Sequence, residues 1–192
     1  WSERNIATFL ARFTFNRNHL VIVPNCSWPG SECDLLVVTP NLRVIDVEIK
    51  ISRSDLKADA RKDKWFHAWD WKIDGPYPQQ GSKRNCRSRQ WPRKVWKHYY
   101  CLPAEIWEPD LTECIAPVSG ILLIHDNPAG SNYNPPSPLK ITCERPAKPR
   151  RDAERISAED AVDIARLASL RMWDAYEVCD RLAAENQRRV AA

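Results

Sequence analysis

Two acidic residues and a lysine have a spacing that suits chemistry on a phosphate ester. Glu48 and Lys50 lie two residues apart in a strand-like segment, and thirteen residues separate Asp34 from Glu48. Two paired strands and a tight turn use about that many residues, so the two carboxylates are expected to converge. Carboxylate oxygens suit Mg²⁺, and a nearby ammonium would stabilise negative charge on a reacting phosphate. The pattern predicts metal-dependent phosphodiester hydrolysis.

The segment around these residues separates into two faces. In residues 42–51 the odd positions from 45 onward are apolar and β-branched, whereas the even positions are charged (Asp46, Glu48 and Lys50). Successive side chains of a strand point to opposite faces, so one face is expected to pack in the core and the other to carry the charges. An ordinary solvated face is the alternative interpretation.

Three further acids are candidates for the same site. Glu32 and Asp46 share the strand faces of the first two acids and could replace or supplement them. Glu3 lies along the apolar side of a helix expected over residues 3–13, with Ser2 as its N-cap. A buried charge is costly unless it is paired or bound to a metal, which makes Glu3 a candidate accessory ligand. A place in a frayed first helical turn is the alternative.

The arrangement resembles the PD-(D/E)XK nuclease superfamily over roughly residues 1–148. The resemblance rests on Asp34, on Glu48-Ile49-Lys50 in a strand, and on a preceding helix that bears Glu3. Cys33 stands where the name of the motif has proline. The resemblance implies that Asp34, Glu48 and the Ile49 carbonyl bind the metal and that Lys50 is the catalytic lysine. It also implies an α/β (α+β) fold in which helices flank a mixed β-sheet.

The segments after the motif strand are similar to those of small bacterial and phage DNA-repair members of that superfamily. They include Ser54-Asp55-Leu56, then Asp59 with Lys62 and Lys64, and Lys97-His98-Tyr99-Tyr100 before Pro103. The implied cofactor is Mg²⁺, and Mn²⁺ is expected to support activity as well.

Hydrophobic periodicity and turn formers predict three helices and a sheet of five or so strands, for which the sequence has six candidate segments. A helix is expected over residues 55–66, and a second one begins after the N-cap Ser157, which has an acid three residues later at Asp160. Strands are expected at residues 20–23, 34–38, 42–51, 95–102, 118–125 and 139–143.

The chain is expected to form one domain with a C-terminal appendage. Residues 1–148 are assigned to the domain, with an insertion at about 69–92, and residues 149–192 to a basic linker and a helix. An apolar stripe on that helix is expected to pack on the domain or on a partner helix, and so to allow a homo-oligomer (Ala161, Ile164, Ala165, Ala168, Met172, Ala175 and Cys179).

A basic segment rich in aromatic residues is expected to hold nucleic acid. No acid occurs between Gly75 and Ala104, and positive charge in such a stretch attracts phosphates (Lys83, Arg84, Arg87, Arg89, Arg93, Lys94 and Lys97). Tryptophans in or before it would stack on unpaired bases (Trp65, Trp69, Trp71, Trp91 and Trp96). The alternative is a small satellite core under a soluble loop. His98 and Tyr100 share a strand face and are interpreted as packed residues rather than as two side chains that act together in general-base catalysis.

Composition limits the setting more than the function. The chain has 192 residues, a formal net charge of +4 and seven cysteines without zinc-knuckle spacing, which indicates a reducing cytoplasm. No apolar run approaches the length of a membrane span, and no signal peptide is visible in the sequence.

The function expected from these features is hydrolysis of DNA in repair, recombination or phage replication. Single strands, flaps and distorted duplexes are the expected substrates. A nucleic-acid-binding module without activity, an RNA-directed nuclease and a regulatory scaffold that docks a partner through its C-terminal helix are the alternatives. The intact Asp34, Glu48 and Lys50 argue against the inactive module.

Overall fold

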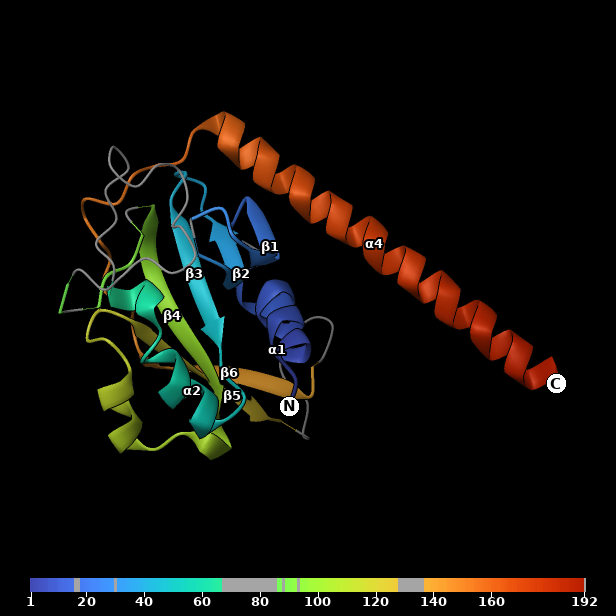
Figure 1. Cartoon of the computed structure of the whole chain (residues 1–192), viewed down its shortest axis with the longest axis horizontal. Coiled ribbons are helices and arrows are strands. Elements are labelled where there is room, and N and C mark those ends of the chain that lie inside the picture. The colour runs from blue at the N-terminus through green and yellow to red at the C-terminus, as the bar shows by residue number, and fades with distance from the viewer. Residues whose placement is uncertain are drawn as a thin grey trace.

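A mixed β-sheet lies at the centre of the fold. The computed structural model describes residues 1–15, 18–29, 31–66, 86–87, 89–92, 94–127 and 137–191. These residues form a six-stranded sheet in the order β1-β2-β3-β4-β5-β6, with helices around it (Figure 1). The strands β1 to β3 are antiparallel, β3, β4 and β5 are parallel, and β6 returns antiparallel to β5. The expected α+β class, with a helix-flanked mixed sheet, is confirmed.

The strands agree in place with those expected, and the described sheet has six of them where about five were expected. Their bounds are β1 Val21–Cys26, β2 Cys33–Val38, β3 Val44–Ile49, β4 Val95–Pro103, β5 Gly120–Asp126 and β6 Leu139–Arg145.

The N-terminal helix is capped as the sequence predicts. In α1 (Glu3–Phe9) the Ser2 hydroxyl accepts a hydrogen bond of 3.2 Å from the Asn5 amide, and the chain continues as a π-helical turn η1 (Leu10–Phe15). The expectation that Glu3 lies on the buried side is wrong, because its side chain is exposed in the first turn. The helix dipole favours an acid there, so no buried partner is required.

The predicted hairpin between β2 and β3 is confirmed, and its turn is tightly specified. Leu42 has a φ of 59° in this turn, and the amide of Thr39 donates to the carbonyl of Arg43 at 2.9 Å. The strands pair with Leu35 opposite Val47 and Leu36 opposite Asp46. Continued by one residue, this register faces Asp34 to Glu48.

Both faces of the central strands are covered. On one face, apolar residues of β2 and β3 pack against α1, with Ile6, Phe9 and Leu10 fully or nearly buried. On the other, a second apolar cluster forms beneath α2 (Arg53–Asp59) and the 3-10 helix η4 (Pro109–Cys114). The charged side of β3 belongs to this second face, so the solvated face considered above is wrong: Asp46, Glu48 and Lys50 are 1%, 2% and 4% exposed.

The connection from β3 to β4 carries the helix that covers the charged side chains. The expected helix over residues 55–66 is two shorter elements, α2 and the 3-10 helix η2 (Asp63–Phe66). Ser52 caps α2 by accepting from the Asp55 amide at 3.1 Å. After β4, a further 3-10 helix, η3 (Ala104–Ile106), precedes η4.

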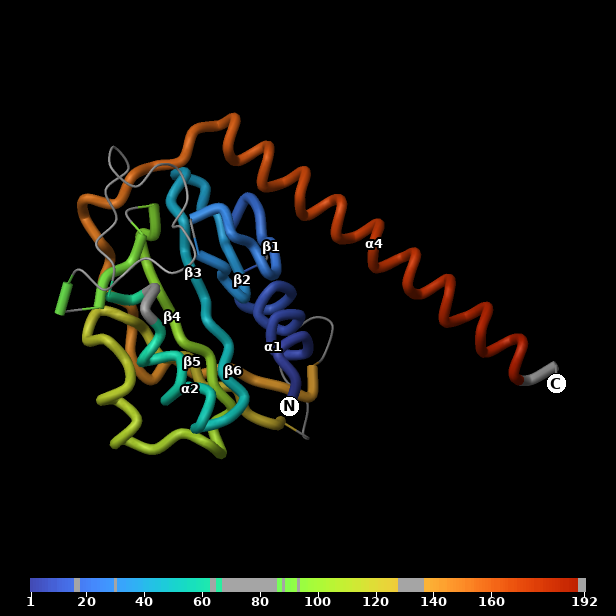
Figure 2. Tube along the Cα trace, in the orientation of Figure 1, coloured from blue at the N-terminus to red at the C-terminus, as the bar shows by residue number. Residues whose placement is uncertain are grey.

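The C-terminal helix α4 (Ala158–Ala191) is anchored at its start and extends away from the sheet (Figures 1 and 2). The expected cap is present, since the Asp160 amide donates to the Ser157 hydroxyl at 2.9 Å. Ile164 is 2% exposed in an apolar cluster with β1, β2 and β3, whereas Trp173 and Tyr176 are 60% and 54% exposed. The apolar stripe therefore packs on the domain through its first turns. No helix within the described residues is long and apolar enough to cross a membrane.

Candidate metal centre

The three residues singled out by their spacing meet at one place in the structure. The ammonium nitrogen of Lys50 lies 2.9 Å from Glu48 Oε2 and 3.6 Å from Asp34 Oδ2. The hairpin register leads to this convergence, because Leu35 pairs with Val47, so that the next residues, Asp34 and Glu48, face each other, and Lys50 directly follows β3. The side chain of Asp34 is 24% exposed, whereas those of Glu48 and Lys50 are 2% and 5% exposed. Asp34 is thus the member of the group that solvent reaches.

Lys50 is held as a cation. Burial alone would lower the pKa of its amine, but the surrounding carboxylates of Glu48, Asp34 and Asp59 outweigh burial and raise the pKa well above its ordinary value. The Lys50 amide also donates to the Cys101 carbonyl at 3.0 Å, which fixes the backbone beside β4. Lys50 therefore supplies a positive charge and hydrogen-bond donors and does not act as a base at neutral pH.

Asp34 is held in an environment that opposes its charge. Burial, followed by the neighbouring charge of Glu48, raises the pKa of its carboxyl group above the ordinary value, although Lys50 and the Ile49 amide act in the other direction. The Ile49 amide donates to Asp34 Oδ2 at 2.6 Å. A bound cation would relieve the repulsion between the two acids.

Asp59 is a member of the site that the sequence analysis did not assign to it. It is fully buried on α2, and its carboxylate accepts hydrogen bonds from Tyr100 at 2.8 Å and from the indole of Trp65 at 3.1 Å. Lys62 lies 2.8 Å from it and Lys50 3.8 Å. The available signal was its place three residues after Leu56, on the side of the helix that faces the sheet.

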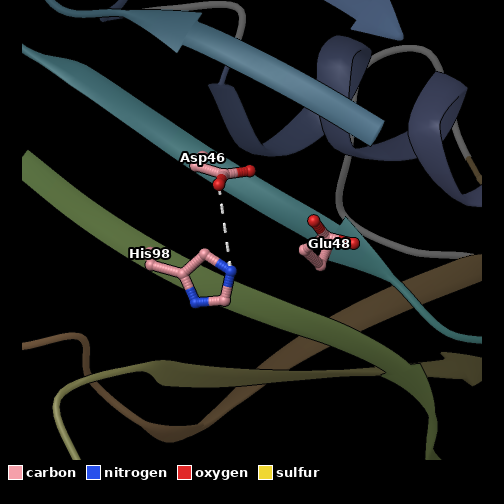
Figure 3. Close-up of side chains that lie close together, drawn as sticks. All are labelled: Asp46, Glu48 and His98. Carbon is pink, nitrogen blue, oxygen red and sulfur yellow. Dashed lines mark ion pairs between the residues drawn. The ribbon is translucent and has the colours of Figure 1, made fainter. Parts of the chain in front are cut away.

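A second group of ligand atoms shares Glu48 with the first. Asp46, Glu48 and His98 each offer an oxygen or nitrogen atom, and these atoms lie within 4.8 Å of one another (Figure 3). His98 Nε2 is 3.9 Å from Asp46 Oδ2, and its other ring nitrogen is 2.9 Å from the Ser119 hydroxyl. Asp46 was ranked as a secondary ligand, while His98 joins it because β3 and β4 pair Asp46 with His98.

The expected packing role of the two β4 residues is confirmed. His98 and Tyr100 are 4% and 1% exposed, and their rings meet edge to face with centroids 4.9 Å apart. The Tyr100 hydroxyl donates to Asp59, and burial followed by the charge of Asp59 raises the pKa of the phenol.

The two outlying acids lie on the surface. Glu32 is exposed before β2, and Glu3 is exposed on α1. The charge of Glu3 contributes to the raised pKa of Asp34. Glu3 and Asp34 line the same cleft, which has a volume of about 1300 Å³ and lies between α1 and α4. Glu3 therefore stays a candidate accessory ligand, since it is near the exposed acid of the site.

The basic residues expected to hold nucleic acid fall in three groups. Lys83, Arg84 and Arg93 lie outside the described residues. Arg87 is exposed. The other three make contacts within the chain: Arg89 donates to the Cys114 carbonyl, the Lys94 ammonium lies 4.1 Å from the Trp28 ring centre, and that of Lys97 lies 4.7 Å from the Trp96 ring centre.

The tryptophans near this segment contribute to packing where they are described. Trp65 is 1% exposed, with its ring centre 5.4 Å from those of Trp91 and His98. Its ring is covered and so is not available to stack on a base, which favours the satellite-core alternative for this residue. Trp96 packs against the cluster beneath α1. Trp69 and Trp71 lie outside the described residues, as does most of the expected insertion.

Comparison with known proteins gives no family. A scan against protein-family models finds no match, and a search of the curated proteins finds none either. Among solved structures, a protein of unknown function from Silicibacter pomeroyi is similar, with 17% identity and a TM-score of 0.42. The similarity covers 92% of this chain and 88% of that one. What the site does is therefore inferred from its own residues.

Proposed function

We propose that this protein is a metal-dependent nuclease that hydrolyses phosphodiester bonds of DNA, of the PD-(D/E)XK type. The observation that carries the proposal is the meeting of Asp34, Glu48 and Lys50, with the lysine ammonium 2.9 Å and 3.6 Å from the two carboxylates. Two buried charged residues, Glu48 and Lys50, beside the partly exposed Asp34 are expensive to keep unless they perform a function.

The residues fit a hard divalent cation. Asp34 and Glu48 offer carboxylate oxygens, and the pKa of Asp34 is raised by burial and then by the neighbouring charge of Glu48. Asp34, Glu48 and the Ile49 carbonyl would hold Mg²⁺ or Mn²⁺, with Glu3 as an accessory ligand. When bound, the ion would activate water and polarise the phosphodiester. The neighbouring group with His98 has an imidazole, which suits transition metals better than Mg²⁺.

The chain's own groups have separate tasks in this proposal. Lys50, held as a cation, orients the attacking water and stabilises negative charge on the phosphate oxygens. The Ile49 amide fixes the orientation of Asp34 through the 2.6 Å hydrogen bond. Asp59 keeps the lysine in position and is itself held by Tyr100 and Trp65, so it is a positioning residue.

The setting that we propose is the cytoplasm, in DNA repair, recombination or phage replication. All seven cysteines belong to the described residues and none is in a disulfide bond, which agrees with a reducing compartment. An RNA-directed nuclease and a binding module without activity are the outcomes that would replace the proposal.

The test is cleavage of single-stranded, duplex and flap DNA, and of RNA of the same sequence, with Mg²⁺, Mn²⁺ or EDTA. Glu48→Gln removes a proposed ligand, and Glu144→Gln changes an exposed acid on β6 and serves as the matched control. Cleavage that needs both metal and Glu48 and is unaffected by Glu144→Gln supports the proposal. Preference for RNA, or binding without cleavage by a folded wild-type protein, would replace it with one of the alternatives.

A further inference from the structure

A cleft of described residues opens beside the proposed metal site, and Asp34 and Ile49 are among the residues that line it. It lies between α1 and α4 and has a volume of about 1300 Å³. Pockets for small molecules occupy roughly 300–1,000 Å³. A cleft above that range suits a segment of a polymer better than a single small ligand.

The two walls explain why the space is open. One wall is formed by Arg4, Ala7 and Thr8 of α1 and by Ala11 and Arg12 of η1, so small side chains leave room between two cations. On the α4 wall, Arg171 donates a hydrogen bond of 2.6 Å to the Asn25 carbonyl at the end of β1. This bond ties α4 to the end of β1.

The charge of the cleft is unevenly distributed. Its acids at the proposed metal site are Glu3 and Asp34, and apart from these the lining carries Asp174 and the three arginines. Arg4 and Arg12 are exposed. A chain of phosphates could pair with the arginines while one phosphodiester approaches the metal-binding acids.

Exposed aromatic side chains stand on the α4 side. Tyr176 lines the cleft and is 54% exposed, and the ring of Trp173, 60% exposed, meets it edge to face at 5.8 Å. Unpaired bases stack on such rings, whereas the base faces in a duplex are already stacked on one another. Arginines together with exposed rings therefore suit a single strand.

We infer that the cleft between α1 and α4 binds a single-stranded nucleic acid and leads it past Asp34. Arg4 of α1 and Arg12 of η1 contact its phosphates, and Tyr176 and Trp173 stack on its bases. The inference rests on the proposed function for the position of the cleaved bond. It gives α4 a part in substrate binding that is separate from the basic segment before β4.

Binding and cleavage are measured separately to test this. Binding of a fluorescein-labelled oligothymidine strand is followed by fluorescence anisotropy in EDTA over a series of salt concentrations. One variant combines Arg4→Ala with Arg12→Ala, and another combines Trp173→Ala with Tyr176→Ala. The control combines Arg151→Ala with Arg155→Ala, which are exposed arginines before α4 and do not line the cleft. Circular dichroism and light scattering establish the fold and the oligomeric state of each protein.

The affinity of the arginine variant should be lower than that of the wild type by about tenfold or more. The steepness of the plot of log affinity against log salt concentration should fall by about 0.7 for each lost phosphate contact. The aromatic variant should lose about tenfold in affinity with the slope unchanged. The control should bind like the wild type. Wild-type binding in both cleft variants, or no binding by the wild type, would overturn the inference. A dimer that dissociates in the cleft variants while strand binding persists would also overturn it and would assign the cleft to a second copy.

The failure of this inference can be told apart from failure of the proposed function. Cleft-dependent binding by a wild type that cuts no DNA or RNA with any metal contradicts the proposed function and supports the cleft as a strand-binding site. Metal-dependent cutting that is equal in the wild type and in both cleft variants contradicts the cleft and supports the proposed function.

Discussion

The carboxylate of Asp34 accepts a 2.6 Å hydrogen bond from the backbone amide of Ile49, the residue between Glu48 and Lys50. This contact ties the exposed acid of the site to the strand that carries the other two members. The superfamily resemblance implies that the carbonyl of the same residue, Ile49, is a metal ligand.

Replacing Asp34 should separate stability from activity. The folded-state pKa of this carboxyl group is raised, so its protonated form is favoured by folding. That stabilisation is complete below the unfolded pKa and is lost as the pH rises through the folded pKa. Asp34→Asn, whose side-chain oxygen can still accept from Ile49, should therefore melt at a higher temperature than the wild type at neutral pH in EDTA. The difference should disappear in acid, while cleavage with Mg²⁺ falls at least about a hundredfold. A variant that melts lower at neutral pH would contradict this.

Removing the ammonium of Lys50 should destabilise the fold as well as abolish cleavage. Lys50→Ala leaves Glu48 and Asp59 buried with less positive charge beside them, and breaking such a buried ion pair costs about 3–5 kcal/mol. Urea unfolding at neutral pH measures this loss. The exposed Lys57→Ala on α2 is the control and should change the free energy of unfolding by less than about 0.5 kcal/mol. Equal stabilities of the two variants would show that the carboxylates do not depend on Lys50.

The hydroxyl of Tyr100 should stabilise the buried carboxylate of Asp59. Tyr100→Phe removes a 2.8 Å hydrogen bond to a fully buried acid, and a hydrogen bond to a charged group contributes about 1.5–3 kcal/mol. Chemical denaturation of Tyr100→Phe and of Tyr176→Phe, an exposed tyrosine, gives the comparison. No greater loss at Tyr100 than at Tyr176 would be evidence against a charged Asp59.

The first turns of α4 should contribute to the stability of the domain. Ile164 is 2% exposed and Val162, two residues earlier, is 67% exposed. Ile164→Ala should reduce the free energy of unfolding by about 2–5 kcal/mol through lost burial and a cavity, and Val162→Ala should have an effect below about 0.5 kcal/mol. Similar small effects of both substitutions, measured by urea unfolding, would mean that α4 is not packed on the sheet in solution.

Local sequence patterns were sufficient to predict the hairpin and the caps. The alternation in β3 reports the two faces of a strand, and a short turn brings Asp34 opposite Glu48. Ser2, and Ser157 with Asp160, cap helices through contacts within three residues, so their signals lie entirely in the neighbouring sequence.

Contacts between distant segments could not be predicted in the same way. Asp59 joins Lys50 because α2 crosses over the sheet, and His98 approaches Asp46 because β4 lies parallel to β3. Burial of the charged face of β3 also depends on α2 and on the other segments that pack over this face. The alternation shows that two faces differ, but it does not show which of them meets water.

The turn from Thr39 to Leu42 makes the site sensitive to the length of the chain. Leu42 has the left-handed backbone conformation there, and the pairing that follows it places the even positions of β3 on the side of Asp34. If one residue were inserted into this turn while β2 and β3 stayed paired, Val47 and Ile49 would move to the side of Asp34. Asp46, Glu48 and Lys50 would then point into the apolar packing beneath α1. Substitutions in this turn can preserve the site, whereas a one-residue change in its length exchanges the charged and apolar layers of the domain.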